Sequence, residues 1–133
     1  MIDLNNYIGK QFSPNARGPD EYDCWGLVSE ILEKEKGYKL PVWFVPDYTD
    51  MGAQKTLSRG LKDCLNKEYA VRVDEPQDFD IAMLTRKKLA YHIGLYIGTK
   101  VLHVSKTTSG VVYQNINDFT RNAGELRFYR WVA

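Results

Sequence analysis

The spacing of the apolar residues changes along this 133-residue chain, and the change limits the folds that the chain can adopt. Up to about residue 66, apolar residues recur three and four positions apart, as on the buried face of a helix. Beyond residue 70 they occur in short runs or alternate with polar residues, which is typical of strands. Helices followed by a run of strands indicate an α+β fold. We therefore predict one domain over residues 1–133, with N-terminal helices packed on an antiparallel β-sheet.

Two helices are expected in the first half of the chain. The first covers residues 24–36, and Gly37 is suited to end it. Its buried face would be formed by Cys24, Leu27, Val28, Ile31 and Leu32. The second extends from about residue 51 to residue 66, with Asp50 as its N-cap. Its apolar line would be formed by Leu57, Leu61, Cys64 and Leu65.

Short strands are expected in the second half of the chain. They cover residues 71–73, 79–84, 91–97, 101–105, 111–115 and 126–132. The basic run 86–88 is expected to be a solvated hairpin loop near the site, where it could meet an anionic substrate. Before the first helix, residues 1–22 would form a turn or short helix and then a loop. The connection 38–49 carries aromatic side chains that would belong to the core, a cleft wall or a partner surface, namely Trp43, Phe44 and Tyr48.

The composition is that of an ordinary globular protein. Hydrophobic residues make up 44% of the chain and charged residues 26%, and the net charge of +1 gives no overall field to attract nucleic acid or a membrane surface. No apolar run is long enough to cross a bilayer, and the first residues lack the basic and apolar regions of a signal peptide. We therefore expect synthesis in the cytoplasm, and delivery by a carrier if the protein acts elsewhere. The oligomeric state is left open.

Residues 22–28 place a cysteine at the expected start of the first helix. Asp23 is a good N-cap, because its carboxylate accepts a backbone N–H that the helix leaves unpaired. Cys24 would then hold the first helical position, where the helix dipole favours the nucleophilic thiolate over the thiol. The backbone N–H of Cys24 is also a natural donor to an oxyanion. A buried cysteine is more often a small core residue, which is our interpretation of Cys64.

The chain has two histidines, His92 and His103, and both lie in the expected hairpin 91–105. If residues 98–99 form a two-residue turn, His103 lies opposite Gly94, on the strand face that also carries His92. The two imidazoles would then be diagonal neighbours, with Cα atoms roughly 7–8 Å apart. A three-residue turn would instead place them on opposite faces. A cysteine at a helix start with two histidines on strands is the composition of a cysteine hydrolase.

These three side chains suit complementary roles in acyl transfer. Cys24 would attack a carbonyl carbon and form an acyl-enzyme. His92 would take the thiol proton and return it to the leaving amine, and His103 would hold the tautomer and ring orientation of His92. The alternative is that both histidines are ordinary strand residues with no catalytic role. A zinc site is disfavoured because the spacing lacks a paired-ligand motif, so we expect no metal and no cofactor.

Three segments, in this order along the chain, resemble motifs of the NlpC/P60 family of papain-like cysteine peptidases. They are residues 22–28 (YDCWGLV), 91–98 (YHIGLYIG) and 101–104 (VLHV). Residues 76–84 resemble the family strand that precedes the histidine. The resemblance implies a papain-like α+β fold. It also implies hydrolysis of peptide bonds in bacterial peptidoglycan stem peptides, often between D-glutamate and a diamino acid.

The resemblance further implies roles for individual residues. The catalytic residues would be Cys24, His92 and His103. The helix cap and oxyanion site would be formed by Asp23 and the Cys24 backbone, and the substrate-binding residues would be Tyr22, Trp25 and Phe12. Phe12 stands where many members carry a tyrosine whose hydroxyl assists the site, so this chain lacks that hydroxyl.

Trp25 stands where most members have serine, and together with residues 37–41 it is more similar to the version found in phage tail proteins. This implies a phage- or prophage-encoded, tail-associated protein that acts on the cell wall and has other tail proteins as partners. Two alternatives stay open. One is a structural tail-assembly component that keeps the fold and uses residues 38–49 as an interface. The other is an acyltransferase or amidase that acts on a different amide.

Overall fold

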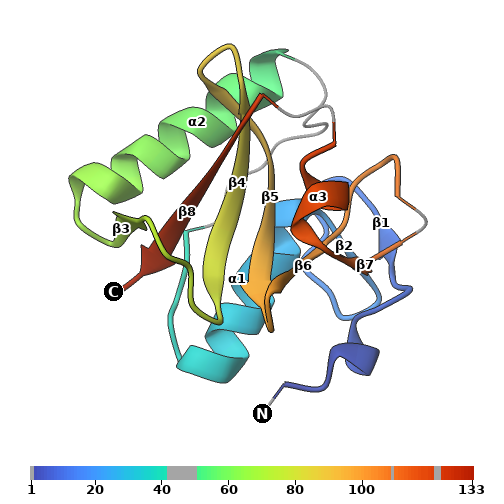
Figure 1. Cartoon of the computed structure of the whole chain (residues 1–133). Helices are drawn as coiled ribbons and strands as arrows, with labels where there is room; N and C mark the ends of the chain where they lie inside the picture. The colour runs from blue at the N-terminus through green and yellow to red at the C-terminus, as the bar shows by residue number, and fades with distance from the viewer. Residues whose placement is uncertain (1, 42–50, 109, 122–123) are drawn as a thin grey trace.

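The computed structural model describes residues 2–41, 51–108, 110–121 and 124–133. Within these residues, one antiparallel sheet forms the centre of the protein (Figure 1). Its strands are β3 (Ala70–Val73), β4 (Asp80–Arg86), β5 (Leu89–Ile97), β6 (Lys100–His103), β7 (Val112–Gln114) and β8 (Glu125–Trp131). They lie in the order β3-β8-β4-β5-β6-β7, so β7 is at one edge. The predicted α+β class with an antiparallel sheet is confirmed.

Helix α1 (Cys24–Lys36) has the predicted bounds. The Asp23 side chain caps its first turn by accepting the backbone N–H of Gly26, and Gly37 ends the helix with a left-handed φ of 72°. Helix α2 (Met51–Asn66) also has the expected extent. Asp50 and residues 42–49, which include Trp43, Phe44 and Tyr48, lie outside the described residues. In that part of the chain which the structure describes, no helix has both the length and the apolar character needed to cross a membrane.

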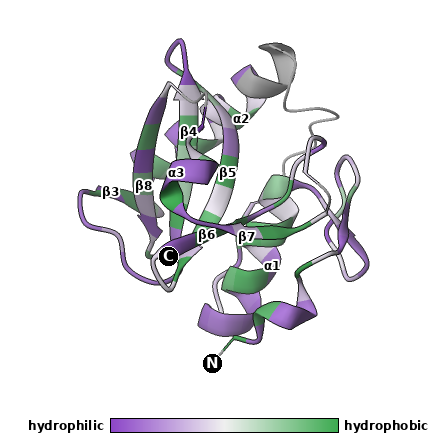
Figure 2. Ribbon diagram, turned by 45° about the vertical axis from the view of Figure 1, so that its right-hand side comes forward, coloured by the Kyte–Doolittle hydropathy of each residue, from purple (hydrophilic) through white to green (hydrophobic). Residues whose placement is uncertain are grey.

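The two faces of the sheet belong to different hydrophobic clusters. Helices α1 and α2 pack on one face, where their buried side chains join Ile81, Ile93 and Leu95. The short helix α3 (Ile116–Phe119) contributes Phe119 to a smaller cluster with residues of the other face, among them Ala82. Figure 2 shows hydrophobic and hydrophilic residues alternating along the strands and around α1, as expected for elements with one buried face.

The hairpin of β5 and β6 has the predicted register. Ile97 pairs with Lys100 and Leu95 with Leu102, which makes residues 98–99 a two-residue turn. Gly98 and Thr99 both have positive φ, 57° and 67°, as this mirror-image hairpin turn requires. Continuing the same register places His103 opposite Gly94. The prediction that the two-residue turn places His92 and His103 on the same face of the sheet is therefore confirmed.

Several elements differ from the sequence-based expectation. The basic run 86–88 differs only in that Arg86 ends β4; Lys87 and Lys88 form the two-residue turn of the β4–β5 hairpin, with φ of 52° and 68°, and all three residues are exposed, as predicted for a solvated hairpin loop. The 3-10 helix η1 (Leu4–Asn6) agrees with the turn or short helix expected near the N-terminus, but the helix α3 and the parallel pair of β1 (Gln11–Phe12) and β2 (Glu21–Tyr22) were not expected. Elements of two to four residues are too short to show a periodic pattern in the sequence.

The edge strand β7 is held at its start by the N-terminal segment. The Gly9 N–H donates to the Val111 carbonyl over 2.9 Å, and the Val111 N–H donates to the Lys10 carbonyl over 2.7 Å. On its other side β7 pairs with β6, with Val101 opposite Gln114 and His103 opposite Val112. Residues from the start of the chain therefore anchor the strand that follows the hairpin.

Candidate active site

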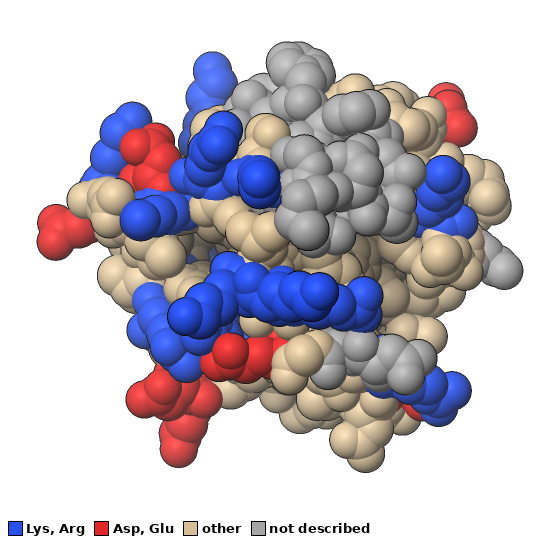
Figure 3. Space-filling model, turned by 90° about the horizontal axis from the view of Figure 1, so that it is seen from above, with Lys and Arg blue, Asp and Glu red and all other residues tan. Residues whose placement is uncertain are grey.

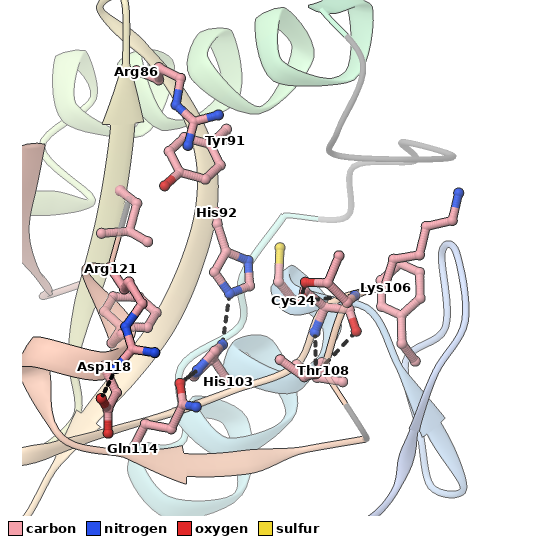
Figure 4. Close-up of a pocket in the computed structure, with 16 residues that line it drawn as sticks. Cys24, Arg86, Tyr91, His92, His103, Lys106, Thr108, Gln114, Asp118 and Arg121 are labelled. Carbon is pink, nitrogen blue, oxygen red and sulfur yellow. Dashed lines mark hydrogen bonds and ion pairs between the residues drawn. The ribbon is translucent and has the colours of Figure 1, made fainter. Parts of the chain in front are cut away.

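A cavity of about 290 Å³ has Cys24, His92 and His103 in its lining. The three side chains come from different elements, namely the start of α1, the middle of β5 and the end of β6. Figure 4 shows the Cys24 sulfur and the His92 ring projecting toward one another in this cavity. The structure thus brings together the three residues that the sequence predicts as a catalytic group.

The buried carboxylate of Asp23 fixes the start of α1. It accepts the Gly26 N–H over 2.6 Å, the Asn15 N–H over 3.1 Å and the Arg17 guanidinium over 2.7 Å. Burial raises the pKa of Asp23, and these three partners limit the rise. Asp23 therefore ties the loop at residues 15–17 to the helix turn that carries Cys24. The Cys24 backbone N–H lies in this first turn, where helix N–H groups have no intrahelical acceptor.

The two histidines are joined by a hydrogen bond. His92 Nε2 lies 2.8 Å from His103 Nδ1, and the ring planes are inclined by 71°. Gly94 makes this approach feasible, because a Cβ at that position would lie 2.9 Å from the His103 Cβ and 2.6 Å from Val101 Cγ1. The glycine of the sequence motif therefore leaves the room that His103 occupies.

Both imidazoles are buried, with 9% of His92 and 5% of His103 exposed. Burial lowers the pKa of His92 to about 3, and the neighbouring His103 acts in the same direction. Burial also lowers the pKa of His103, while its hydrogen bond to Gln114 acts in the opposite direction. Each ring is therefore neutral near pH 7 and has one N–H donor and one nitrogen lone pair that can accept. A neutral His92 can accept a proton.

Two residues that contact the histidines were missed by the sequence analysis. Gln114 on β7 places its Oε1 2.7 Å from His103 Nε2. Phe119 on α3 packs its ring on both imidazoles, with centroids 4.8 Å from His103 and 5.8 Å from His92. The strand around Gln114 was expected, but its register with the preceding strand depends on a loop without a recognisable turn motif. The contact could therefore not be read from the sequence.

The three predicted substrate-binding residues have different positions. Phe12 lines the cavity. Trp25 is fully buried, donates from Nε1 to the Pro41 carbonyl over 2.8 Å and packs edge-on against Trp131. Tyr22 is 1% exposed and donates its hydroxyl hydrogen bond to Glu30. Neither Tyr22 nor Trp25 lines the cavity, so the expectation that they contact a substrate there is corrected: both are parts of the core.

Basic side chains surround the cavity. Its lining includes Arg86, Lys106 and Arg121, while Asp118 is the single carboxylate among the described lining residues and pairs with Arg121 over 3.0 Å. Arg86 lies over the Tyr91 ring. Seen from above, lysine and arginine side chains gather across the middle of this face of the protein (Figure 3). Among the described residues, no group of three or more His, Cys, Asp and Glu side chains could hold a metal ion.

Known proteins share this arrangement of elements. The model of the NlpC/P60 family matches residues 9–124. Among solved structures, the NlpC/p60 domain of the peptidoglycan hydrolase SagA is similar over 97% of this chain and 92% of that chain, with 16% identity and a TM-score of 0.62. NlpC1 from Trichomonas vaginalis is similar over 98% of this chain but 42% of that chain, with 18% identity and a TM-score of 0.61. A comparison with curated proteins gives no significant match. Because the family match spans most of the sequence, this chain belongs to the NlpC/P60 family.

Proposed function

We propose that this protein is a cysteine peptidase that hydrolyses peptide bonds in bacterial peptidoglycan stem peptides, of the type that joins D-glutamate to a diamino acid. One observation carries the proposal: the buried His92–His103 pair shares a cavity with Cys24 at the start of a helix. Membership of the NlpC/P60 family supports the choice of reaction and polymer.

The reaction would proceed in two balanced halves. Cys24 Sγ attacks the carbonyl carbon while its proton passes to His92, and the Cys24 backbone N–H stabilises the oxyanion. The C–N bond then breaks, and His92 returns the proton to the leaving amine. In the second half, water attacks the thioester while His92 takes its proton. The S–C bond breaks, and the proton goes to the departing thiolate, which restores Cys24.

The charge of the cavity supports an anionic peptide as the substrate. Stem peptides that contain D-glutamate and a diamino acid carry free carboxylates. Arg86, Lys106 and Arg121 line the cavity together with a single described carboxylate, Asp118. Guanidinium and ammonium groups are the donors that bind carboxylates most strongly. These cations would orient the substrate without taking part in the bond cleavage.

The more specific part of the proposal is that the protein is associated with a phage or prophage tail. It depends on the likeness of Trp25 and residues 37–41 to phage tail proteins of this family. In this role the protein would reach the cell wall as a component of a phage or prophage tail, with other tail proteins as partners. Trp25 itself would serve this role only as a core residue, because it is fully buried.

The test begins with alkylation by iodoacetamide at neutral pH, followed site by site with mass spectrometry. Cys64 is an internal control, because it is buried and its thiol pKa is raised to about 11 by burial. We expect Cys24 to react much faster than Cys64, and the His92→Ala variant to lose that advantage. Purified muropeptides with a D-glutamyl–diamino acid bond should be cleaved by the native protein and left intact by Cys24→Ala.

Two outcomes would overturn the proposal. If Cys24 reacts no faster than Cys64 and muropeptides stay intact, the protein is a structural component that keeps the peptidase fold. If Cys24 reacts fast but muropeptides stay intact while another amide or ester is cleaved, the site belongs to an acyltransferase or amidase on a different substrate.

A further inference from the structure

Three side chains on successive strands form a continuous hydrogen-bonded chain. His92 on β5 bonds to His103 on β6 over 2.8 Å, and His103 bonds to Gln114 on β7 over 2.7 Å (Figure 4). Each link joins residues that are 11 positions apart in the sequence. Val101 pairs with Gln114 and lies on the same strand face as His103, so both links cross the sheet diagonally. The chain ends at Gln114 on one side and at His92, beside Cys24, on the other, and all of these residues line the cavity.

We propose that Gln114 is a positioning residue that sets the direction of the protons in both histidines, and thereby leaves His92 Nδ1 free to take the thiol proton of Cys24. The proposal rests on the proposed function, since it assigns a role within the same site. An amide oxygen only accepts hydrogen bonds, so His103 Nε2 must carry the hydrogen of its ring. His103 Nδ1 is then an acceptor, and the hydrogen between the two rings must belong to His92 Nε2.

The remaining nitrogen of His92, Nδ1, is the one that would take the proton of Cys24. With its hydrogen on Nε2, His92 has its lone pair on Nδ1. Figure 4 shows this nitrogen on the side of the ring that faces the Cys24 sulfur. If the amide of Gln114 presented its NH2 group instead, every hydrogen in the chain would reverse. His92 Nδ1 would then carry a hydrogen and could not accept one from Cys24.

Because both imidazoles are buried, the positions of their hydrogens depend on the group that Gln114 presents to His103. Both imidazoles are neutral near pH 7, because burial lowers the pKa of each. A neutral ring has one N–H, so the chain of two rings has only two consistent arrangements of hydrogens. Phe119 packs against both rings, T-shaped on His103 and tilted on His92, and limits the access of water, which could otherwise bond to either nitrogen. The acceptor at the end of the chain therefore selects the arrangement.

The direct readout is the protonation of each imidazole nitrogen, measured by NMR on protein labelled with 15N-histidine near pH 7. The chain has two histidines, so the few ring signals can be assigned with a His103→Asn variant. In the native protein we expect His92 and His103 to carry hydrogen on Nε2 and none on Nδ1. The variant Gln114→Glu keeps an acceptor, whereas Gln114→Leu removes it. The matched control is Gln77→Leu, which changes an exposed glutamine outside the lining of the cavity.

We expect Gln114→Leu to give a mixture of tautomers in both rings and a kcat lowered by about 10-fold or more, with the ~10²–10⁴-fold that a positioned base contributes as the upper limit. The KM should change little, because the amide would act through its hydrogen bond to His103 and not on the substrate itself. Gln114→Glu should keep the native tautomers and move the acidic limb of the pH–rate profile upward, since a carboxylate raises the pKa of the histidines. Gln77→Leu should match the native protein.

Failure of this inference can be distinguished from failure of the proposed function. A native His92 with its hydrogen on Nδ1 would overturn the inference, and so would a Gln114→Leu variant with native tautomers and a native pH–rate profile. Native tautomers in a protein that cleaves no muropeptide would leave the hydrogen arrangement intact and overturn only the peptidase. Thermal melting of each variant shows whether it is folded, and the NMR readout does not require activity.

Discussion

At the scale of single residues, Gly94 decides whether the two histidines can lie side by side. Its position opposite His103 leaves the space in which the His103 side chain sits, and a Cβ there would contact Val101 Cγ1, His103 Cβ and the Leu102 carbonyl at 2.6, 2.9 and 3.0 Å. All three atoms belong to the neighbouring strand. The strand pair would therefore have to separate or shift to accept any other residue.

We expect Gly94→Ala to lower the free energy of unfolding by about 1–3 kcal/mol, as is usual for an overpacked site. Activity should fall by more than the loss of folded protein explains, because His103 would be displaced from its 2.8 Å contact with His92. Urea denaturation and muropeptide cleavage measure the two effects. The second substitution Val101→Ala removes the nearest atom and should recover part of the stability. A Gly94→Ala protein with native stability and activity would contradict this account.

At the scale of elements, α3 and β7 complete a site that begins on α1, β5 and β6. Gln114 ends β7 and Phe119 ends α3, so only four residues separate the side chain that bonds to His103 from the ring that packs on both imidazoles. Asn115 caps α3 by accepting the Asp118 N–H over 2.8 Å. This cap makes the chain turn back over the histidines directly after β7.

We expect Phe119→Ala to destabilise the protein by about 3–5 kcal/mol, the usual cost of removing a buried phenylalanine. Its more specific effect should be on titration. Water would reach the imidazoles, so the pKa of His92 should rise from its depressed value toward that of a free histidine. NMR titration of the two histidines measures this directly, and Phe119→Leu, which keeps an apolar cover, is the control. An unchanged His92 titration in Phe119→Ala would show that the ring contributes nothing to the desolvation.

The same elements show what the sequence can and cannot reveal. Helix α1 was predicted to the residue, because Asp23 and Gly37 are local signals for its two ends. The hairpin was predicted because a two-residue turn fixes its register. Gln114 could not be placed, since the link from β6 to β7 has no such signal. Trp25 was misassigned for a related reason: its partners Pro41 and Trp131 are distant in sequence, and only the packing reveals that it belongs to the core.

At the scale of the whole molecule, the two buried histidines link stability to pH. In the unfolded chain each would bind a proton below its ordinary pKa of 6.5, whereas in the folded protein both have lower pKa values. The unfolded state therefore binds more protons in this range, and stability falls as the pH falls through 6.5. For His92 the effect continues down to a pH of about 3. Asp23, whose pKa is raised, acts in the opposite direction only in the range where carboxylates titrate.

We expect the free energy of unfolding to drop between pH 7.5 and pH 5.5, approaching about 1.4 kcal/mol per pH unit for each histidine once the pH is below 6.5. Urea denaturation at several pH values measures the slope. The double variant His92→Gln/His103→Asn should show a much flatter profile over the same range. Stability that stays level or increases on acidification in the native protein would contradict the buried, neutral state of the pair.

The position of β7 at the rim of the sheet affects how long the site stays assembled. Gln114 lies on a three-residue strand whose outer side is held near Val111 by residues 9 and 10. Rim strands fray by local opening far more often than a protein unfolds as a whole. Each such opening would release Gln114 and leave the two imidazoles without a fixed order of hydrogens, while α1 and the central strands remain folded. The lifetime of the assembled site would then be set by local opening at this rim, which amide hydrogen exchange reports, rather than by global unfolding.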